Sequence, residues 1–386
     1  MEITTNNLRL LIMDNFEEFG KKVDGHLKLM RGVTTPNATF IVPTRLTRFA
    51  SGEGKGEILE SIRGKETYIL TDVMNHSCTY EMHGYLNHKS PDDHYQDLKR
   101  VISAMDGAED KLTVIMPFIY EGRQHKRKGR ESKDCSLMLQ ELESLGVDSF
   151  ITFDAHDPSI RNSLHSCSFD SIYPTYSILK EFIENEPIEL NNFLVASPDM
   201  GAIERAKCYA EMLNTPFGFC YKRRDMTRVV NGKNPIIAHE YLGTSVEGKN
   251  VIVVDDMIAS GQSMLEVAEQ LKDRGAANIY LIASFALFSD GQKSVDAFNE
   301  AYQKGTFKRC YTSNLCYIPE EARKQEWLKT GDNSKYVAKL IDTLNKHESI
   351  SPLLDSKSKI LTKVRDLRGT KAVSYTHLRA HETEAD

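Results

Sequence analysis

The sequence predicts an α/β protein of two domains, each with a mainly parallel sheet flanked by helices. The chain has 386 residues, which is enough for two domains of ordinary size. Short apolar segments typical of buried strands alternate with amphipathic segments typical of helices. This alternation occurs in two separate stretches, and strands that alternate with helices form parallel sheets.

The first alternating stretch predicts three strands and two helices. Its strands are short runs of apolar and aromatic residues, and its second helix is closed by Gly146, a residue type that favours helix ends. The predicted strands are 68–72, 112–117 and 150–153, and the predicted helices are 94–106 and 132–145.

The second stretch repeats this scheme with four strands and two helices. The predicted strands are 193–196, 217–221, 250–254 and 279–284, and the helices are 202–213 and a segment that begins at 264. We expect domains at 1–168 and 169–352, followed by a tail at 353–386. Residues 222–248 carry charge, Gly and Pro with little periodicity, which predicts a mobile loop over a site.

Composition excludes several classes of protein. The net charge is −6, so general affinity for nucleic acid is not expected. No run of eighteen apolar residues predicts a membrane span, and the N-terminus lacks the pattern of a signal peptide. The seven cysteines are scattered without a CxxC pair, which is typical of reduced thiols and predicts a cytoplasmic protein.

The last fourteen residues, 373–386, continue no pattern from the rest of the chain. Their sequence, VSYTHLRAHETEAD, resembles translated cloning sequence rather than native protein. We therefore exclude them, including their two histidines, from functional interpretation.

The segment VIVVDDMIASGQS, residues 251–263, carries the clearest chemical signal. Its apolar start predicts a buried strand, and Asp255 and Asp256 follow where α/β sheets bind ligands. Residues 259–263 then offer hydroxyl and backbone N–H groups to a phosphate at the start of a helix. Because the two carboxylates can accept hydrogen bonds from sugar hydroxyls, the segment indicates a phosphorylated sugar. A buried strand with an ordinary polar turn is the alternative.

Two further strand ends carry candidate metal ligands. Asp199 follows the strand at 193–196 and could hold Mg²⁺, which prefers one or two carboxylates plus phosphate oxygens and water. Capping of the next helix is an equally supported role. His156 follows the strand at 150–153 and could contact a metal or a phosphate, although a lone histidine is usually structural. Four histidines without metal spacing are expected on the surface: His76, His83, His88 and His94.

Two basic segments suit phosphate groups. Residues 221–225, YKRRD, place three consecutive cations where they could offset charge on a transferring phosphoryl group. Residues 123–130 gather cations in a loop after a strand, and this density of donors suits a triphosphate. Solvated basic surface is the alternative for both segments. No GxxxxGKS or GxxxxGKT motif is present, so ATP would bind by another route.

Taken together, these segments resemble ribose-phosphate pyrophosphokinase, also called phosphoribosyl pyrophosphate synthetase. The resemblance extends in order over residues 40–352. It rests on RFASGE at 48–53, the basic loop, DAHD, SPDMG, KRR and VVDDMIASG. It implies two phosphoribosyltransferase-like domains related by a pseudo-twofold, with the last helix of the second domain packing on the first.

The resemblance also implies an activity and partners. The family transfers the pyrophosphoryl group of ATP to the C1 hydroxyl of ribose 5-phosphate, giving phosphoribosyl pyrophosphate and AMP for nucleotide biosynthesis. Mg²⁺ is the expected cofactor, and a homo-oligomer, hexameric or built from dimers, is the expected assembly. No nucleic acid or membrane partner is expected.

Site residues follow from the matching motifs. Ribose 5-phosphate would be held by the carboxylates Asp255 and Asp256 and by the loop residues Ala259, Ser260, Gly261, Gln262 and Ser263. ATP would be bound by Phe49, Glu53, Arg123 and Gln124, with the first two contributed to a neighbouring subunit's adenine pocket. The metal would be held by His156 and Asp199, and the reacting phosphates by Lys222 and Arg224.

Three positions depart from the family pattern, which usually has an acid at each. These residues are Ser51, His125 and Ala259. They mark a divergent branch and bear on nucleotide preference and allostery more than on the reaction. Two other functions stay open: a phosphoribosyltransferase, which shares the 251–263 segment, and a non-catalytic homologue that regulates an active synthetase.

Overall fold

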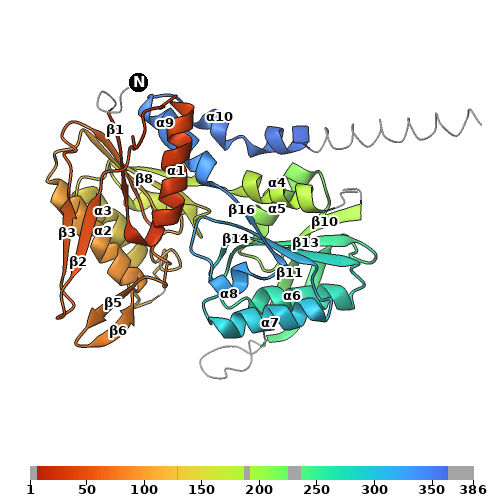
Figure 1. The fold of residues 1–386 in the computed structure, drawn as a ribbon. Coiled ribbons are helices and arrows are strands. Elements are labelled where there is room, and N and C mark those ends of the chain that lie inside the picture. The colour runs from red at the N-terminus through yellow and green to blue at the C-terminus, as the bar shows by residue number, and fades with distance from the viewer. Residues whose placement is uncertain (1–6, 128, 187–191, 225–235, 364–386) are drawn as a thin grey trace, which may run out of the picture.

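The computed structural model describes residues 7–127, 129–186, 192–224 and 236–363, and of 222–224 and 236–239 it describes the backbone alone. Figure 1 shows two α/β domains side by side, each built around its own sheet. In the described residues, no helix combines the length and the apolar character that a membrane crossing requires.

The first sheet has five parallel strands in the order β1-β4-β7-β8-β9. They span Leu8–Ile12, Glu66–Leu70, Lys111–Ile115, Ser149–Phe153 and Ser168–Ile172. Two antiparallel hairpins extend from this domain: β2 (Thr44–Arg48) with β3 (Gly54–Ile58), and β5 (Thr79–Met82) with β6 (Tyr85–His88). Its helices are α1 (Glu17–Met30), α2 (Pro91–Met105) and α3 (Asp134–Ser144), with short 3₁₀ turns η2 (Asp14–Phe16) and η3 (Pro158–Ser163).

The second sheet has seven strands in the order β12-β11-β10-β13-β14-β15-β16. They span Ile236–Gly243, Phe217–Arg224, Phe193–Ser197, Asn250–Ile258, Asn278–Ala286, Arg309–Ser313 and Leu328–Gly331. All neighbours are parallel except the edge strand β12, which runs antiparallel to β11. The accompanying helices are α4 (Thr175–Asn185), α5 (Ile203–Leu213), α6 (Gln262–Asp273), α7 (Gln292–Gln303), α8 (Glu320–Arg323), α9 (Ser334–Asn345) and α10 (Ser351–Leu354).

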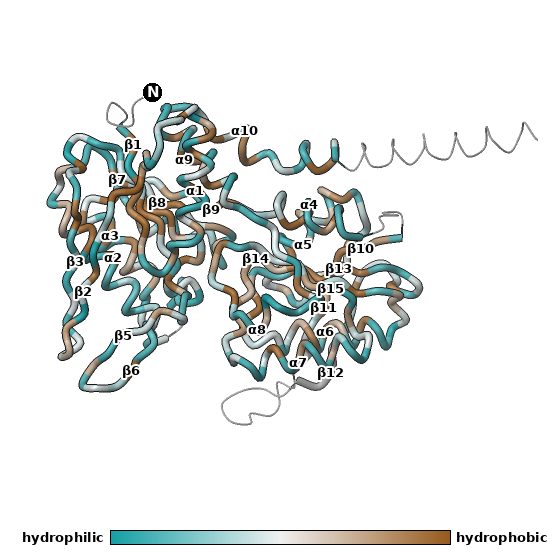
Figure 2. Tube along the Cα trace, viewed as in Figure 1, coloured by the Kyte–Doolittle hydropathy of each residue, from teal (hydrophilic) through white to brown (hydrophobic). Residues whose placement is uncertain are grey.

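The predicted elements of both stretches are confirmed, with ends that move by a few residues. The prediction of a loop over 222–248 is wrong at 222–224, the end of β11, and at 236–243, which form β12, because the two strands pair and so satisfy their backbone hydrogen bonds. Residues 225–235 of the predicted loop lie outside the described residues. In Figure 2 the apolar residues concentrate in the central strands, and the outer faces of the helices are hydrophilic. This layering is what buried parallel sheets require.

The chain returns to the first domain after completing the second sheet. Helix α9 packs against α1, and Arg31, the C-cap residue of α1, lies 2.7 Å from Asp342 of α9. Val337 and Ile341 of α9 belong to the same buried cluster as Leu8 of β1. The first sheet itself continues to Ile172, beyond the boundary predicted at 168/169, so we propose to place the boundary in the link between β9 and α4.

Candidate active site

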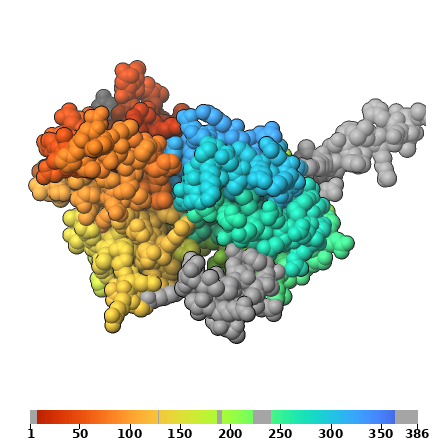
Figure 3. Space-filling view, turned by 90° about the horizontal axis from the view of Figure 1, so that it is seen from below, coloured from red at the N-terminus to blue at the C-terminus, as the bar shows by residue number. Residues whose placement is uncertain are grey.

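A pocket of about 250 Å³ opens on the seam between the two domains. Figure 3 shows this seam between the orange and yellow N-terminal domain and the green and blue C-terminal domain. The pocket lies at the carboxyl ends of β8, β10 and β13, where ligands of open α/β sheets bind. Its polar and loop lining includes Arg123, His156, Asp199, Gly201, Arg205, Asp255, Asp256, Ala259, Ser260, Gly261 and Ser263.

The loop between β13 and α6 forms one wall of this pocket. Gly261 precedes α6 with φ +82°, and a Cβ atom there would lie 2.2 Å from a ring carbon of Phe298. Only glycine therefore combines this backbone conformation with this close packing. The loop leads directly into the N-terminal end of α6, and the N-terminal end of a helix is a favourable place for a phosphate. Gln262 lies outside the pocket lining, and its side chain donates to Glu266.

Asp255 and Asp256 lie at the end of β13 in different electrostatic surroundings. Burial, reinforced by the neighbouring carboxylate of Asp256, raises the pKa of Asp255. Burial also acts on Asp256, but the hydrogen bond from His156 and the charge of Arg205 outweigh it and lower the pKa of Asp256. Both carboxyl groups offer oxygen atoms that can accept hydrogen bonds from the hydroxyls of a sugar.

His156 reaches across the seam from the end of β8. Its Nδ1 lies 2.7 Å from Oδ2 of Asp256, and this hydrogen bond raises the pKa of the imidazole. With Nδ1 donating to a carboxylate, Nε2 is the ring nitrogen left for a metal, which is the usual arrangement of metal-binding histidines. The described residues contain no group of three His, Cys, Asp or Glu side chains placed to hold a metal. Mg²⁺ needs fewer protein ligands than that, because phosphates and water complete its shell.

Asp199 lies at the end of β10 and lines the pocket. Its Oδ1 accepts hydrogen bonds from the backbone N–H groups of Gly201, at 2.8 Å, and Ala202, at 3.2 Å. The side chain therefore stabilises the turn that precedes α5, while the N-cap position of the helix is Ala202, which has no side-chain cap. These contacts use one carboxylate oxygen, and Oδ2 is the atom that would face a metal.

Arg205, which no sequence motif assigned to the site, lies in the pocket lining. Its guanidinium forms a buried ion pair with Asp154, from the end of β8, at 2.8 Å. The sequence places Arg205 in the first turn of a helix that follows a strand, which is a common place for a site residue. Its partner Asp154, however, lies 51 residues away in the other domain. A contact of that range is visible only in the folded chain.

The two basic segments are placed differently. Arg123 lines the pocket and contacts the sulfur of Met257 across the seam. Lys222 and Arg224 form the last part of β11, next to β10, and their side chains lie outside the described residues. Gln124 lies apart from this pocket, in a separate hollow that it shares with Asp92, Glu121 and Asp134.

The two expected adenine contacts also lie apart from the pocket. Phe49, which is 50% exposed, follows β2, and Glu53 precedes β3 in the same hairpin. The Oε2 atom of Glu53 accepts a hydrogen bond from Ser51, one of the departures from the family pattern. In one subunit, therefore, these side chains do not join the residues around Asp255.

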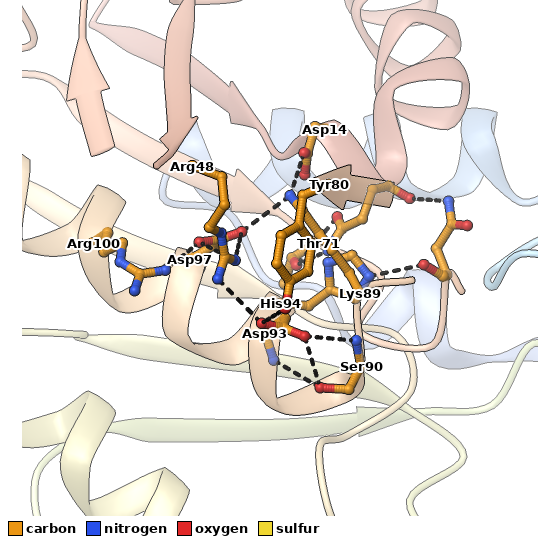
Figure 4. A network of polar contacts seen from close by, with 12 residues as sticks. Asp14, Arg48, Thr71, Tyr80, Lys89, Ser90, Asp93, His94, Asp97 and Arg100 are labelled. Carbon is orange, nitrogen blue, oxygen red and sulfur yellow. Dashed lines mark hydrogen bonds and ion pairs between the residues drawn. The ribbon is translucent and has the colours of Figure 1, made fainter. Parts of the chain in front are cut away.

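A buried network of charges anchors this hairpin to the domain (Figure 4). Arg48, next to Phe49, bonds Asp93 and Asp97 of α2 at 3.2 Å each and lies over the ring of Tyr80. Lys89 lies between Asp97, at 3.0 Å, and Asp14, at 2.6 Å.

One surface prediction fails beside this network. His94 is fully buried, with Nε2 2.8 Å from the backbone oxygen of Asn75. The prediction that it lies on the surface is wrong, because α2 turns this position toward the core.

Comparison with known proteins gives the same family from two directions. The N-terminal domain of ribose phosphate pyrophosphokinase matches residues 8–146, and the phosphoribosyl transferase domain matches residues 176–306. The ribose-phosphate pyrophosphokinase of Gloeobacter violaceus is 28% identical over 313 residues, covering 78% of this chain and 85% of its own length. That of Staphylococcus saprophyticus is 25% identical, covering 92% of this chain and 99% of its own.

A solved structure shares the fold. Phosphoribosylpyrophosphate synthetase from Mycobacterium smegmatis superposes with a TM-score of 0.72 at 22% identity, over 89% of this chain and all of that one. The two domain matches occur in the order and at the positions of the two sheets. The chain belongs to the ribose-phosphate pyrophosphokinase family.

Proposed function

We propose that this protein transfers the pyrophosphoryl group of ATP to the C1 hydroxyl of ribose 5-phosphate, giving 5-phosphoribosyl 1-pyrophosphate and AMP for nucleotide biosynthesis. The observation that carries this proposal is the pocket on the seam. It joins the Asp255 and Asp256 carboxyl groups to a tight glycine loop at the start of α6. Family membership supports the same reaction.

Each part of ribose 5-phosphate has a counterpart in this pocket. The 5-phosphate would lie at the start of α6, with backbone N–H groups and the hydroxyls of Ser260 and Ser263 as donors. The ribose hydroxyls would bond Asp255 and Asp256. Holding the sugar by both ends fixes the C1 hydroxyl for in-line attack, which is the main requirement of phosphoryl transfer.

Charge neutralisation is the other requirement. We assign Lys222 and Arg224 to the negative charge that builds on the transferring group, because β11 ends at the same edge of the sheet as β10 and β13. Asp199 and His156 would hold Mg²⁺. When bound with ATP, this ion neutralises and orients the phosphate oxygens. His156 would offer Nε2 while Asp256 keeps the ring in place.

ATP would extend away from this pocket. Arg123 lines it and can contact the phosphates, whereas Phe49, Glu53 and Gln124 lie elsewhere on the same subunit. We therefore propose a homo-oligomer in which the hairpin of one subunit completes the adenine site of its neighbour. The described cysteines form no disulfide, which supports placement in the cytoplasm.

One assay tests the reaction. Incubation with ATP, ribose 5-phosphate and Mg²⁺ should release AMP and phosphoribosyl pyrophosphate in equal amounts, measured by chromatography. Release of ADP would refute the proposal. Consumption of phosphoribosyl pyrophosphate with a free base would indicate a phosphoribosyltransferase instead. Absence of turnover, together with co-purification with an active synthetase, would indicate the regulatory homologue.

A further inference from the structure

A buried ion pair joins the two domains beside the proposed ribose carboxylates. Arg205 of α5 donates from Nε to Oδ2 of Asp154 at 2.8 Å, and its Nη2 lies 2.8 Å from Oδ1. The side chains of Arg205 and Asp154 are 10% and 0% exposed. This two-pronged contact needs the planar fork of arginine, which a lysine cannot reproduce.

Asp154 is itself held in an uncommon conformation. Its φ angle is +40°, in the left-handed region that few residues other than glycine adopt. Ser284 of β14, in the second domain, donates a hydrogen bond to Oδ2 of Asp154. The carboxylate of Asp154 is thus held across the seam by two side chains of the second domain, Arg205 and Ser284.

The rest of the guanidinium faces the two ribose carboxylates. Nη1 lies 3.9 Å from Oδ1 of Asp255, and Nη2 lies 4.0 Å from Oδ2 of Asp256. These distances are too long for hydrogen bonds but short enough for strong attraction between poorly hydrated charges. Arg205 therefore offsets carboxylate charge without occupying the acceptor positions that sugar hydroxyls would use.

We infer that Arg205 is a positioning residue for ribose 5-phosphate and that Asp154 holds it at its working distance. The inference rests on the proposed function and adds to it that the first domain controls sugar affinity in the second. If Asp154 released the guanidinium, Arg205 would be free to bond Asp255 and Asp256 directly. It would then compete with the ribose hydroxyls for the same oxygens.

Two conservative variants test this role, with steady-state rates measured for each substrate while the other is saturating. Arg205→Lys keeps the positive charge but cannot form the two-pronged contact with Asp154. Asp154→Asn keeps the shape of the side chain but removes the negative charge that binds the guanidinium. Each should raise KM for ribose 5-phosphate roughly tenfold, the size expected for a disturbed charge-assisted contact, and change KM for ATP less than twofold. Lys207→Ala, at an exposed position on the same helix, is the control and should change neither value.

A double variant shows whether the two residues act as one unit. Arg205→Lys with Asp154→Asn should raise KM for ribose 5-phosphate no further than the worse single variant, because the second change removes a contact already lost. Multiplicative effects would overturn the inference. Equal rises in KM for both substrates would also overturn it, since they indicate general damage to the fold.

Calorimetric titration with ribose 5-phosphate alone measures the affinity of each variant for the sugar in the absence of turnover. Affinity should fall in both variants and stay unchanged in Lys207→Ala. If one variant fails to melt cooperatively, the other decides the question. An inactive wild type that still binds ribose 5-phosphate would count against the proposed reaction only. An active wild type with unchanged affinity in the variants would count against the role of Arg205.

Discussion

His156 and Asp256 share a hydrogen bond of 2.7 Å although 100 residues of chain separate them. Each lies at the carboxyl end of a strand, but the strands belong to different sheets. The proposed metal and sugar sites therefore meet through one contact across the seam. A change to either residue should affect how the two substrates are arranged.

Asp256→Asn should weaken ribose 5-phosphate binding. The amide cannot replace a carboxylate that pairs with His156 and accepts from a ribose hydroxyl, so the dissociation constant should rise roughly tenfold or more. Calorimetry with ribose 5-phosphate alone measures this constant. Asp273→Asn, at an exposed position at the end of α6, is the matched control and should leave it unchanged. Equal affinity in the wild type and the Asp256 variant would contradict the assignment.

Lys222→Ala should act on turnover rather than on sugar binding. If the lysine stabilises charge that develops during transfer, kcat should fall by a factor of about 100 or more while the affinity for ribose 5-phosphate stays within twofold. Lys293→Ala, at an exposed position in α7, controls for loss of a surface charge. Unchanged kcat in the Lys222 variant would remove it from the reaction.

Gly261→Ala and Gly25→Ala should have opposite effects on stability. At Gly261 the positive φ and the close ring of Phe298 should reduce the free energy of unfolding by at least about 2 kcal/mol and weaken ribose 5-phosphate binding. Gly25 lies within α1 with open space around its Cβ position, so alanine there should add about 0.5–1 kcal/mol. Denaturant unfolding measures both. A stabilising Gly261→Ala would show that the loop is not constrained as described.

Asp72 should make the protein less stable as pH rises from about 4 to 6. Burial raises its pKa from 3.8 to about 6, so between these values the folded state holds a proton that the unfolded state releases. The free energy of unfolding should fall by about 3 kcal/mol over this range, because each pKa unit corresponds to about 1.4 kcal/mol.

Denaturant unfolding of the Asp72→Asn variant at pH 4 and pH 7 tests this titration. Between these two pH values, the free energy of unfolding should change less in the variant than in the wild type, and the difference should be about 3 kcal/mol. Its stability at pH 4 should be lower, since the amide oxygen can accept only one of the two N–H groups, of Met74 and Tyr317, that now donate. Equal pH dependence in both proteins would assign the effect to other groups.

Lys89→Met should destabilise the domain that carries the β2–β3 hairpin. The change leaves Asp97, which is 2% exposed, without one of its partners, and breaking a buried ion pair costs about 3–5 kcal/mol. Lys304→Ala, which breaks an exposed pair with Glu300, should cost less than about 0.5 kcal/mol. Thermal and denaturant unfolding compare them. Similar effects at the two lysines would mean that the network contributes little.

Local patterns were sufficient for most of the regular structure. The strands around Val253 and Leu281 are continuous apolar runs because both faces of a parallel sheet are covered. Edge elements were harder to predict. The antiparallel strand β12 and the hairpin β5–β6 mix apolar and polar residues, and pairing with a neighbouring strand, rather than periodicity, determines them.

The residues of the candidate site also differ in how well local sequence predicts their positions. Gly261, Ser263, Asp255 and Asp256 lie in one continuous segment, so their proximity follows from a strand, a turn and a helix read in order. Phe49 and Gln124 come from motifs that match equally well in sequence, yet in one subunit they lie away from the pocket. Motif order carries no information about which side of the molecule a hairpin faces.

By itself, the sequence determined the two-domain α/β fold, the family and the strand–loop–helix order at 251–263, because each rests on short-range periodicity or on contiguous motifs. Only the tertiary structure decided that His156 bonds Asp256 and that Arg205 is held by Asp154. Those contacts join residues 51 or more positions apart across the seam between two sheets. Their energies depend on burial and on distances that exist only once both domains have folded and docked.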